Sequence, residues 1–71
     1  MNKEITACVI VIGNEILSGR TQDLNVAYIG KRCDELGIRL MQTRIIPDVE
    51  ATIVATINEC RRMFTYIFTT G

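Results

Sequence analysis

The stretch Ile5–Ile12, which reads ITACVIVI and is followed by Gly13, decides the fold of this chain. It is continuously apolar and rich in β-branched residues, without the polar alternation of a strand that has one face in water. Such a run is typical of a parallel strand that is buried on both faces. Because parallel strands are joined by crossover helices, we expect this strand to lie at the centre of an α/β sheet with helices packed on it.

A helix is expected downstream of this strand, from about Leu24 to Leu36. Between the two, residues 14–23 (NEILSGRTQD) contain a central glycine and several polar residues, and they indicate a loop. Asp23 is placed to cap the helix and Gly37 to end it. The apolar positions of the helix recur at spacings of three, four and three, which places them on one face. These positions are Val26, Ile29, Cys33 and Leu36.

The second half of the chain repeats the strand and helix pattern. Residues 38–46 (IRLMQTRII) predict a second strand, less uniformly apolar than the first and therefore nearer a sheet edge. Pro47 ends it because proline cannot donate to a ladder, and Asp48 is placed to cap a helix that runs to about Arg62. The expected inner face of that helix consists of Val49, Ile53, Ile57 and Cys60. Residues 66–69 (YIFT) begin a third strand, and Thr70-Gly71 form its exit.

The order β-α-β-α-β predicts a three-layer α/β/α fold with a parallel sheet. If the second and third strands flank the first, the strand order is 2-1-3, and right-handed crossovers place the two helices on opposite faces. The strand order then reverses at the first strand, which creates a crevice above its carboxyl end, where ligands of open α/β sheets bind. Three segments converge there: Gly13–Asp23, Pro47-Asp48 and Thr70-Gly71.

Size and charge limit the function further. A chain of 71 residues allows one small domain, and 48% of its residues are hydrophobic. A domain of this size buries only about 60% of its unfolded surface, so we expect a fold that is incomplete in these residues alone. Eight basic and eight acidic residues give a net charge of zero. No basic patch favours a nucleic-acid or membrane partner.

The cysteine and histidine content limits the kinds of redox, catalytic and metal-binding chemistry that this chain can carry out. Three cysteines, an odd number without a C-x-x-C pair, argue against a disulfide framework, and each falls in an expected strand or helix as a small buried hydrophobe. The absence of histidine excludes an imidazole base or metal ligand. No signal peptide is visible, and the first apolar run is too short to span a bilayer, so we expect a cytoplasmic protein.

Three motifs at the three expected strand exits carry a resemblance. They are Gly13-Asn14-Glu15-Ile16-Leu17-Ser18-Gly19 with Asp23-Leu24-Asn25, then Arg44-Ile45-Ile46-Pro47-Asp48, and finally Thr69-Thr70-Gly71. Together they resemble the CinA-type branch of the molybdopterin-binding domain family, whose patterns are G-D-E-L-L-x-G, D-x-N and T-T-G-G-x-G-P-T. The resemblance covers the whole chain. It implies that residues 1–71 are the N-terminal half of one such domain, ending before the G-x-G-P-T loop.

The resemblance also implies a ligand and a class of chemistry. The ligand is a phosphorylated pterin (molybdopterin) or a nucleotide, and the intact domain is expected to form a homo-oligomer. Related proteins insert molybdenum into molybdopterin or adenylylate it, whereas the CinA branch is associated with hydrolysis of a nucleotide pyrophosphate. Both chemistries act at a phosphate and use a divalent cation such as Mg²⁺, held by carboxylates, to balance negative charge.

The resemblance assigns Asp48 a catalytic and metal-binding role, in concert with a second acid. The alternative from the residues alone is a helix N-cap, worth about 1 kcal/mol. Glu15 is a ligand-binding candidate whose alternative is an ordinary solvated carboxylate. Asn14 stands where the family often has aspartate, which removes a charge. Gly13 and Gly19 are candidates for close approach of the backbone to a ligand, and their alternative is to supply a positive φ. Ser18 and Asn25 are ligand-binding candidates whose alternatives are a turn residue and a helix cap. Thr70 and Gly71 would begin the phosphate-binding loop.

Three hypotheses about function remain open at this point. The first is a molybdopterin- or nucleotide-binding domain whose intact form carries out cation-assisted chemistry at a phosphate. The second is a non-catalytic module that binds a ligand or a partner without turnover. The third is a remnant that is inactive by itself. A phosphate loop and a second acid downstream of Gly71 would favour the first hypothesis, because they would complete its site.

Overall fold

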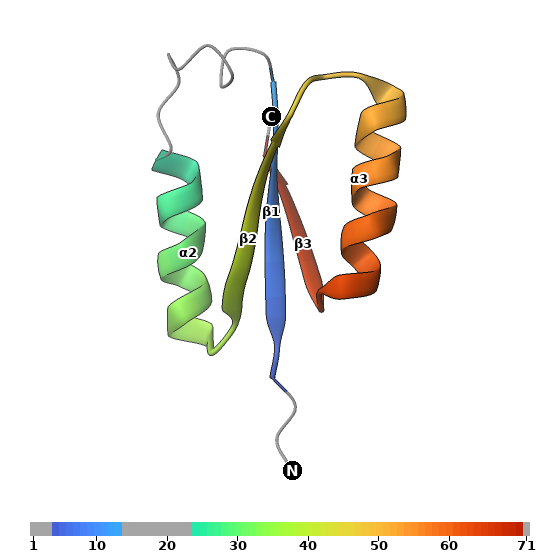
Figure 1. Ribbon diagram of the computed structural model, residues 1–71. Coiled ribbons are helices and arrows are strands. Elements are labelled where there is room, and N and C mark those ends of the chain that lie inside the picture. The colour runs from blue at the N-terminus through green and yellow to red at the C-terminus, as the bar shows by residue number, and fades with distance from the viewer. Residues whose placement is uncertain (1–3, 14–23, 71) are drawn as a thin grey trace.

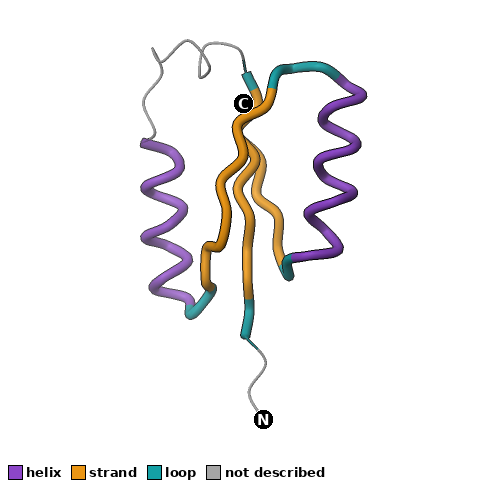
Figure 2. The backbone as a smooth tube through the Cα atoms, in the orientation of Figure 1, coloured by secondary structure: helices purple, strands orange, loops and turns teal. Residues whose placement is uncertain are grey.

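The computed structural model describes residues 4–13 and 24–70, and it has the expected β-α-β-α-β order. The elements are β1 (Thr6–Ile12), α2 (Leu24–Leu36), β2 (Arg39–Ile46), α3 (Glu50–Met63) and β3 (Tyr66–Thr70). The strands form one parallel sheet in the order β2-β1-β3, so the predicted order 2-1-3 is confirmed. Figure 1 shows α2 on one side of this sheet and α3 on the other, and Figure 2 shows the same three layers as a trace.

The central strand β1 forms the core of the domain. All five residues from Ala7 to Val11 are buried, as expected for a strand covered on both faces. Burying one aliphatic side chain of this size contributes about 1.5–3 kcal/mol. On the α3 side, Cys8 and Ile10 form a buried cluster with Ile46 of β2 and Cys60 of α3. Helix α3 therefore packs on β1 and on both of its neighbouring strands.

An irregularity in β2 decides which of its side chains face which helix. The register runs Ala7 to Leu40 and then Cys8 to Gln42, so Met41 is an extra residue without a partner. Side chains of a regular strand alternate, which would put Leu40 and Arg44 on one face. Instead Leu40 lies against Gly30 of α2, whereas Arg44 bonds to Glu59 of α3. The bulge at Met41 thus turns the second half of β2 toward α3.

Helix α2 has the predicted bounds and the predicted glycine end. Gly37 has a positive φ of 77°. The Gly37 amide donates to the Asp34 carbonyl at 3.2 Å and the Ile38 amide donates to the Cys33 carbonyl at 2.8 Å, which is a Schellman motif. Because Ile38 belongs to this motif, β2 begins at Arg39 and not at Ile38. The prediction that Leu36 lies on the buried face is wrong: it is 62% exposed, beyond the reach of the sheet.

The start of α3 corrects a second prediction. Asp48 is not the N-cap: Val49 occupies that position, and no side chain caps the helix. Val49 has extended backbone and is 49% exposed, so it does not belong to the inner face. Ile53 and Ile57 do pack against the core, with Cys60 buried beside them. The helix ends at Met63, because Phe64 returns to extended backbone and leads into β3.

Cys8, Cys33 and Cys60 are all free and buried, as predicted. Within the part of the chain that the structure describes, no helix is long and apolar enough to cross a membrane.

Candidate functional site

The carboxyl ends of the three strands lie at the same end of the sheet, at the top of Figure 1, and this end is called the carboxyl edge below. Ile12 pairs with Ile46, and Val11 pairs with Thr70. The Gly13 amide continues the ladder by donating to the Ile46 carbonyl at 3.1 Å. This arrangement brings together Gly13, the turn after β2 and the end of β3, where the topological switch point of the sheet lies.

Gly13 leaves β1 in a conformation that requires glycine. Its φ is 148°, and the residue is buried. Other residues rarely adopt this region of φ, because a side chain would collide with the backbone. The sequence offered two explanations for this glycine, ligand approach and positive φ, and the structure gives direct support to the second. A bare backbone at the end of β1 is also compatible with the first.

Asp48 lies in the tight turn that follows β2. The Val49 amide donates to the Pro47 carbonyl at 2.9 Å, so Asp48 is the central residue of a three-residue turn. The residue is exposed, and its side chain is not used to cap α3. A carboxylate in this position is exposed to solvent at the carboxyl end of β2. The capping alternative considered from the sequence is therefore removed, and the functional interpretation stays a prediction.

The other predicted site residues are described only in part. Thr70 is half-buried at the end of β3, paired with Val11. The backbone of Asn25 lies in the first turn of α2, and its side chain is not described. Four residues of the first loop and one at the end of the chain lie outside the described residues: Asn14, Glu15, Ser18, Gly19 and Gly71.

The described acids do not by themselves form a metal centre. Among residues 4–13 and 24–70, no group of three or more cysteine, aspartate or glutamate side chains is arranged to hold a metal ion. A magnesium ion needs only one or two carboxylates when substrate phosphates and water supply the remaining oxygens. Among the described residues, Asp48 is an exposed carboxylate that follows the carboxyl end of β2.

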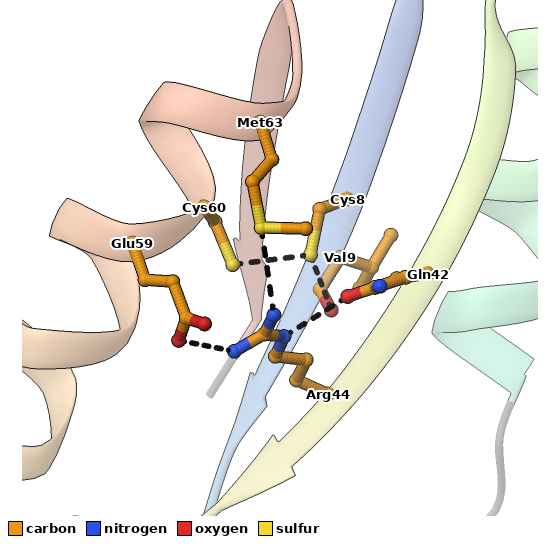
Figure 3. A network of polar contacts seen from close by, with 7 residues as sticks. All are labelled: Cys8, Val9, Gln42, Arg44, Glu59, Cys60 and Met63. Atoms are coloured by element: carbon orange, nitrogen blue, oxygen red, sulfur yellow. Dashed lines mark hydrogen bonds and ion pairs between the residues drawn. The ribbon is translucent and has the colours of Figure 1, made fainter.

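Sequence reasoning did not predict a polar network between β2 and α3, which Figure 3 shows around Arg44. The Arg44 guanidinium donates to Glu59 at 2.8 Å and to Gln42 at 3.1 Å. It also contacts the Met63 sulfur at 3.9 Å. This side chain is 26% exposed, so the guanidinium is partly shielded from water. The hydrogen bond to Glu59 raises the pKa of Arg44, which stays charged. The network fixes the last turns of α3 over β2.

The same region holds a second contact that the sequence did not reveal. The sulfur of Cys8 lies 3.6 Å from the sulfur of Cys60, between the central strand and α3. Burial and the hydrogen bond with Cys60 raise the pKa of the Cys8 thiol to about 11, although the nearby Arg44 charge acts to lower it. At neutral pH this thiol is protonated. A sequence separation of 52 residues gave no signal for the pairing.

Comparison with known proteins shows which protein family this chain resembles. The family model of the probable molybdopterin binding domain matches residues 8–71. A probable FAD synthase of Caenorhabditis elegans is 32% identical over 71 residues, covering all of this chain and 14% of that protein. A CinA-like protein of Amoebophilus asiaticus is 34% identical over 64 residues, covering 89% of this chain and 15% of that protein. A CinA-like protein of Cytophaga hutchinsonii is 32% identical over 71 residues, covering 100% of this chain and 17% of that protein.

These relatives are much longer than the part of them that this chain matches. The chain spans about a seventh of the length of the C. elegans and A. asiaticus proteins. The family model, in contrast, covers β1 from Cys8 onward and every later element through β3. The agreement thus extends over the strands whose carboxyl ends form the candidate site, and the chain belongs to the probable molybdopterin binding domain family.

Proposed function

We propose that the carboxyl edge of the sheet binds the phosphate-bearing part of a pterin or a nucleotide. The observation that carries this proposal is the family match over residues 8–71. It is supported by the positions of Gly13, Asp48 and Thr70, which lie at the carboxyl ends of β1, β2 and β3. Backbone amides and hydroxyl groups at such an edge are suited to phosphate oxygens. A nucleotide ligand also agrees with the name FAD synthase, since FAD contains an adenine nucleotide.

Asp48 supplies the carboxylate of this proposal. Its turn presents it to solvent at the carboxyl edge, and no helix cap occupies its oxygens. In the intact domain it would hold Mg²⁺ against a ligand phosphate, or orient the ligand directly, with a second acid. The predicted partners of Asp48 in this role are Gly13, Asn14, Glu15, Ser18, Gly19, Asn25, Thr70 and Gly71. The chemistry assisted by the cation is transfer to, or hydrolysis at, a phosphate or pyrophosphate.

A calorimetric titration tests the binding step. AMP, ADP-ribose and a pterin phosphate are titrated into the protein with Mg²⁺ and again with EDTA. We expect at least one of them to bind, more tightly with Mg²⁺, and Asp48→Asn to weaken that binding about tenfold or more, the loss expected for one charged contact. The control is Asp34→Asn. Asp34 is exposed in the last turn of α2, at the end of the sheet opposite to Asp48. Equal effects of the two substitutions would argue against the site.

The second candidate function is a binding module without turnover. In its favour, the acidic residues that the structure describes form no preformed metal centre. The two functions differ in one measurement: incubation of ADP-ribose or ATP with Mg²⁺, followed by chromatography of the nucleotides. Binding without product supports the module, whereas release of AMP or pyrophosphate supports the enzyme. Absence of both binding and turnover for every ligand would support the inactive-remnant hypothesis.

We also propose that the protein is cytoplasmic and that the intact domain forms a homo-oligomer. Support for the oligomer comes from the β3 side of the described sheet, where Tyr66 is 48% exposed and stacks on Phe68 with ring centroids 6.3 Å apart. The strand carries no charge or proline of the kind that usually protects an edge. Light scattering of the purified protein should show an oligomer, and Tyr66→Lys should shift it toward the monomer. A well-folded monomer over the same concentration range would contradict this proposal.

A further inference from the structure

The contact between Cys8 and Cys60 is the feature of the described core that the proposed function leaves unused. The two sulfurs lie 3.6 Å apart, and both side chains are fully buried. Cys8 is in the middle of the central strand, and Cys60 is in the last turns of α3. Apart from Cys60, the Cys8 sulfur has one weak polar neighbour, the Val9 carbonyl oxygen at 3.8 Å. Figure 3 shows the two thiols directed at each other.

A positive charge lies close to this pair. Arg44 acts electrostatically on both thiols, and its guanidinium contacts the sulfur of Met63, which is one helical turn beyond Cys60. A cation near two thiols favours the thiolate form, which is the nucleophile in sulfur chemistry. Met63 is 50% exposed, so this turn of α3 borders solvent. The pair is thus fully buried, although it lies one helical turn from an exposed residue.

We propose that Cys8 and Cys60 form a dithiol that hydrogen peroxide oxidises to a disulfide joining β1 to α3. In the first step one thiolate attacks a peroxide oxygen, the O–O bond breaks, and a sulfenic acid and water form. In the second step the other thiol attacks the sulfenyl sulfur, the S–O bond breaks, and a second water leaves. The two thiol protons end on water, so two thiols and one peroxide give one disulfide and two waters.

The geometry requires only a small movement. A disulfide has a sulfur–sulfur bond of about 2.05 Å, so the two sulfurs, now 3.6 Å apart, must close by about 1.5 Å. Rotation of the two side chains, with a small shift of the last turn of α3, would provide this movement. The bond would close a loop of 52 residues, from the central strand to the second crossover helix. It would tie the layer formed by α3 to the sheet.

The rate of the reaction is governed by burial. The pKa of the Cys8 thiol is raised to about 11, so few molecules carry its thiolate at neutral pH. We therefore expect slow oxidation of the folded protein, because both the raised pKa and the burial of the two thiols oppose the reaction.

Cys33 is an internal control in the same chain. It is also buried, at 3% exposure, but it lies on α2, across the sheet from α3. Neither Cys8 nor Cys60 can reach it without unfolding. A reaction specific to the observed contact must leave Cys33 reduced, whereas random oxidation of an unfolded chain would involve all three cysteines.

The test is peroxide oxidation of the purified, folded protein, followed by alkylation in denaturant and intact mass measurement. We expect the main product to have lost two hydrogens and to carry one alkyl group, with peptide mapping that links Cys8 to Cys60 and finds the alkyl group on Cys33. Cys33→Ala should form the same disulfide, whereas Cys8→Ala and Cys60→Ala should not. The oxidised protein should also unfold at a higher temperature, and a thiol reductant should reverse the rise.

Other results of the same experiment would overturn the proposal. A link that includes Cys33, a disulfide between two chains, or a mass gain from sulfinic acid at either residue would overturn the proposal. The proposal would also be overturned if all three thiols of the folded protein could still be alkylated after peroxide treatment. The treatment would have to be one that fully oxidises the same protein in denaturant. The wild-type measurement carries the test by itself, so the conclusion does not depend on whether a core alanine variant folds.

Discussion

Leu40 and Arg44 lie four residues apart on β2, yet they contact helices on opposite faces of the sheet. Leu40 packs at Gly30 of α2, and Arg44 bonds to Glu59 of α3. The cause is the extra residue Met41, which has no partner on β1. One inserted residue reverses the facing of every later side chain in a strand. Ile46, two residues beyond Arg44, accordingly joins the core on the α3 side.

Deletion of Met41 should therefore be far more damaging than its truncation. Without the bulge, either Leu40 or the segment from Gln42 to Ile46 must face the wrong helix. We expect a loss of more than about 3 kcal/mol in the free energy of unfolding, or failure to fold. Met41→Ala is the control: this side chain is 47% exposed, and its truncation should cost less than about 1 kcal/mol. Urea unfolding of the two variants checks the difference, and similar costs would show that the bulge does not set the facing.

The bulge also shows where sequence reasoning about this fold ends. The run Ile5–Ile12 and the two apolar stripes suffice to predict the strand order, the layers and the bounds of α2. A bulge leaves no mark in β2, because Met41 fits a strand with or without it. The turn at Asp48 was misinterpreted as a helix cap because aspartate is common in both settings. The pair Cys8 and Cys60 depends on tertiary packing, which a separation of 52 residues does not reveal.

The two glycines at the middle and the end of α2 should respond to alanine in opposite directions. Gly37 ends the helix at a φ of 77°, so Gly37→Ala should lower the free energy of unfolding by about 1 kcal/mol. Gly30 lies inside the helix, and an added Cβ would sit at 3.6 Å from a Leu40 methyl group, which is an ordinary contact. Gly30→Ala should therefore raise stability by up to about 1 kcal/mol. Thermal unfolding measures both, and a loss in both would mean that α2 packs more tightly on β2 than this contact indicates.

Replacement of Asp48 should separate function from stability. Because its side chain caps no helix and is exposed, Asp48→Ala should change the free energy of unfolding by less than about 0.5 kcal/mol. The loss for a true N-cap would be about 1 kcal/mol. Binding of the nucleotide or pterin phosphate should nevertheless fall. Chemical unfolding and calorimetric titration of the same preparation give the two values. A stable variant with undiminished affinity would remove Asp48 from the site.

The Cys8 thiol should make stability depend on pH in the alkaline range. Its pKa is 9.0 in an ordinary environment and about 11 in the folded protein, because of burial and Cys60 on α3, opposed by the charge of Arg44 on β2. Its partner on β3, Ile67, is uncharged. Above pH 9.0 the unfolded chain loses this proton while the folded chain keeps it, so the unfolded state gains stability. The contribution of this group is therefore complete below that pH and is lost as the pH rises toward about 11.

The size of this effect depends on the shift in the pKa. A rise from 9.0 to about 11 is worth roughly 3 kcal/mol when it is lost completely. Urea unfolding at several values between about pH 8 and about pH 10.5 should show a steeper loss for the wild type than for Cys8→Ala. Lysine and tyrosine also titrate there, so the variant supplies the baseline, and Cys33→Ala controls for removal of a buried thiol. The prediction would be wrong if Cys8→Ala lost stability as steeply as the wild type over this pH range. The Cys8 thiol would then have the same pKa in the folded and the unfolded chain, which would require water to reach it beneath α3.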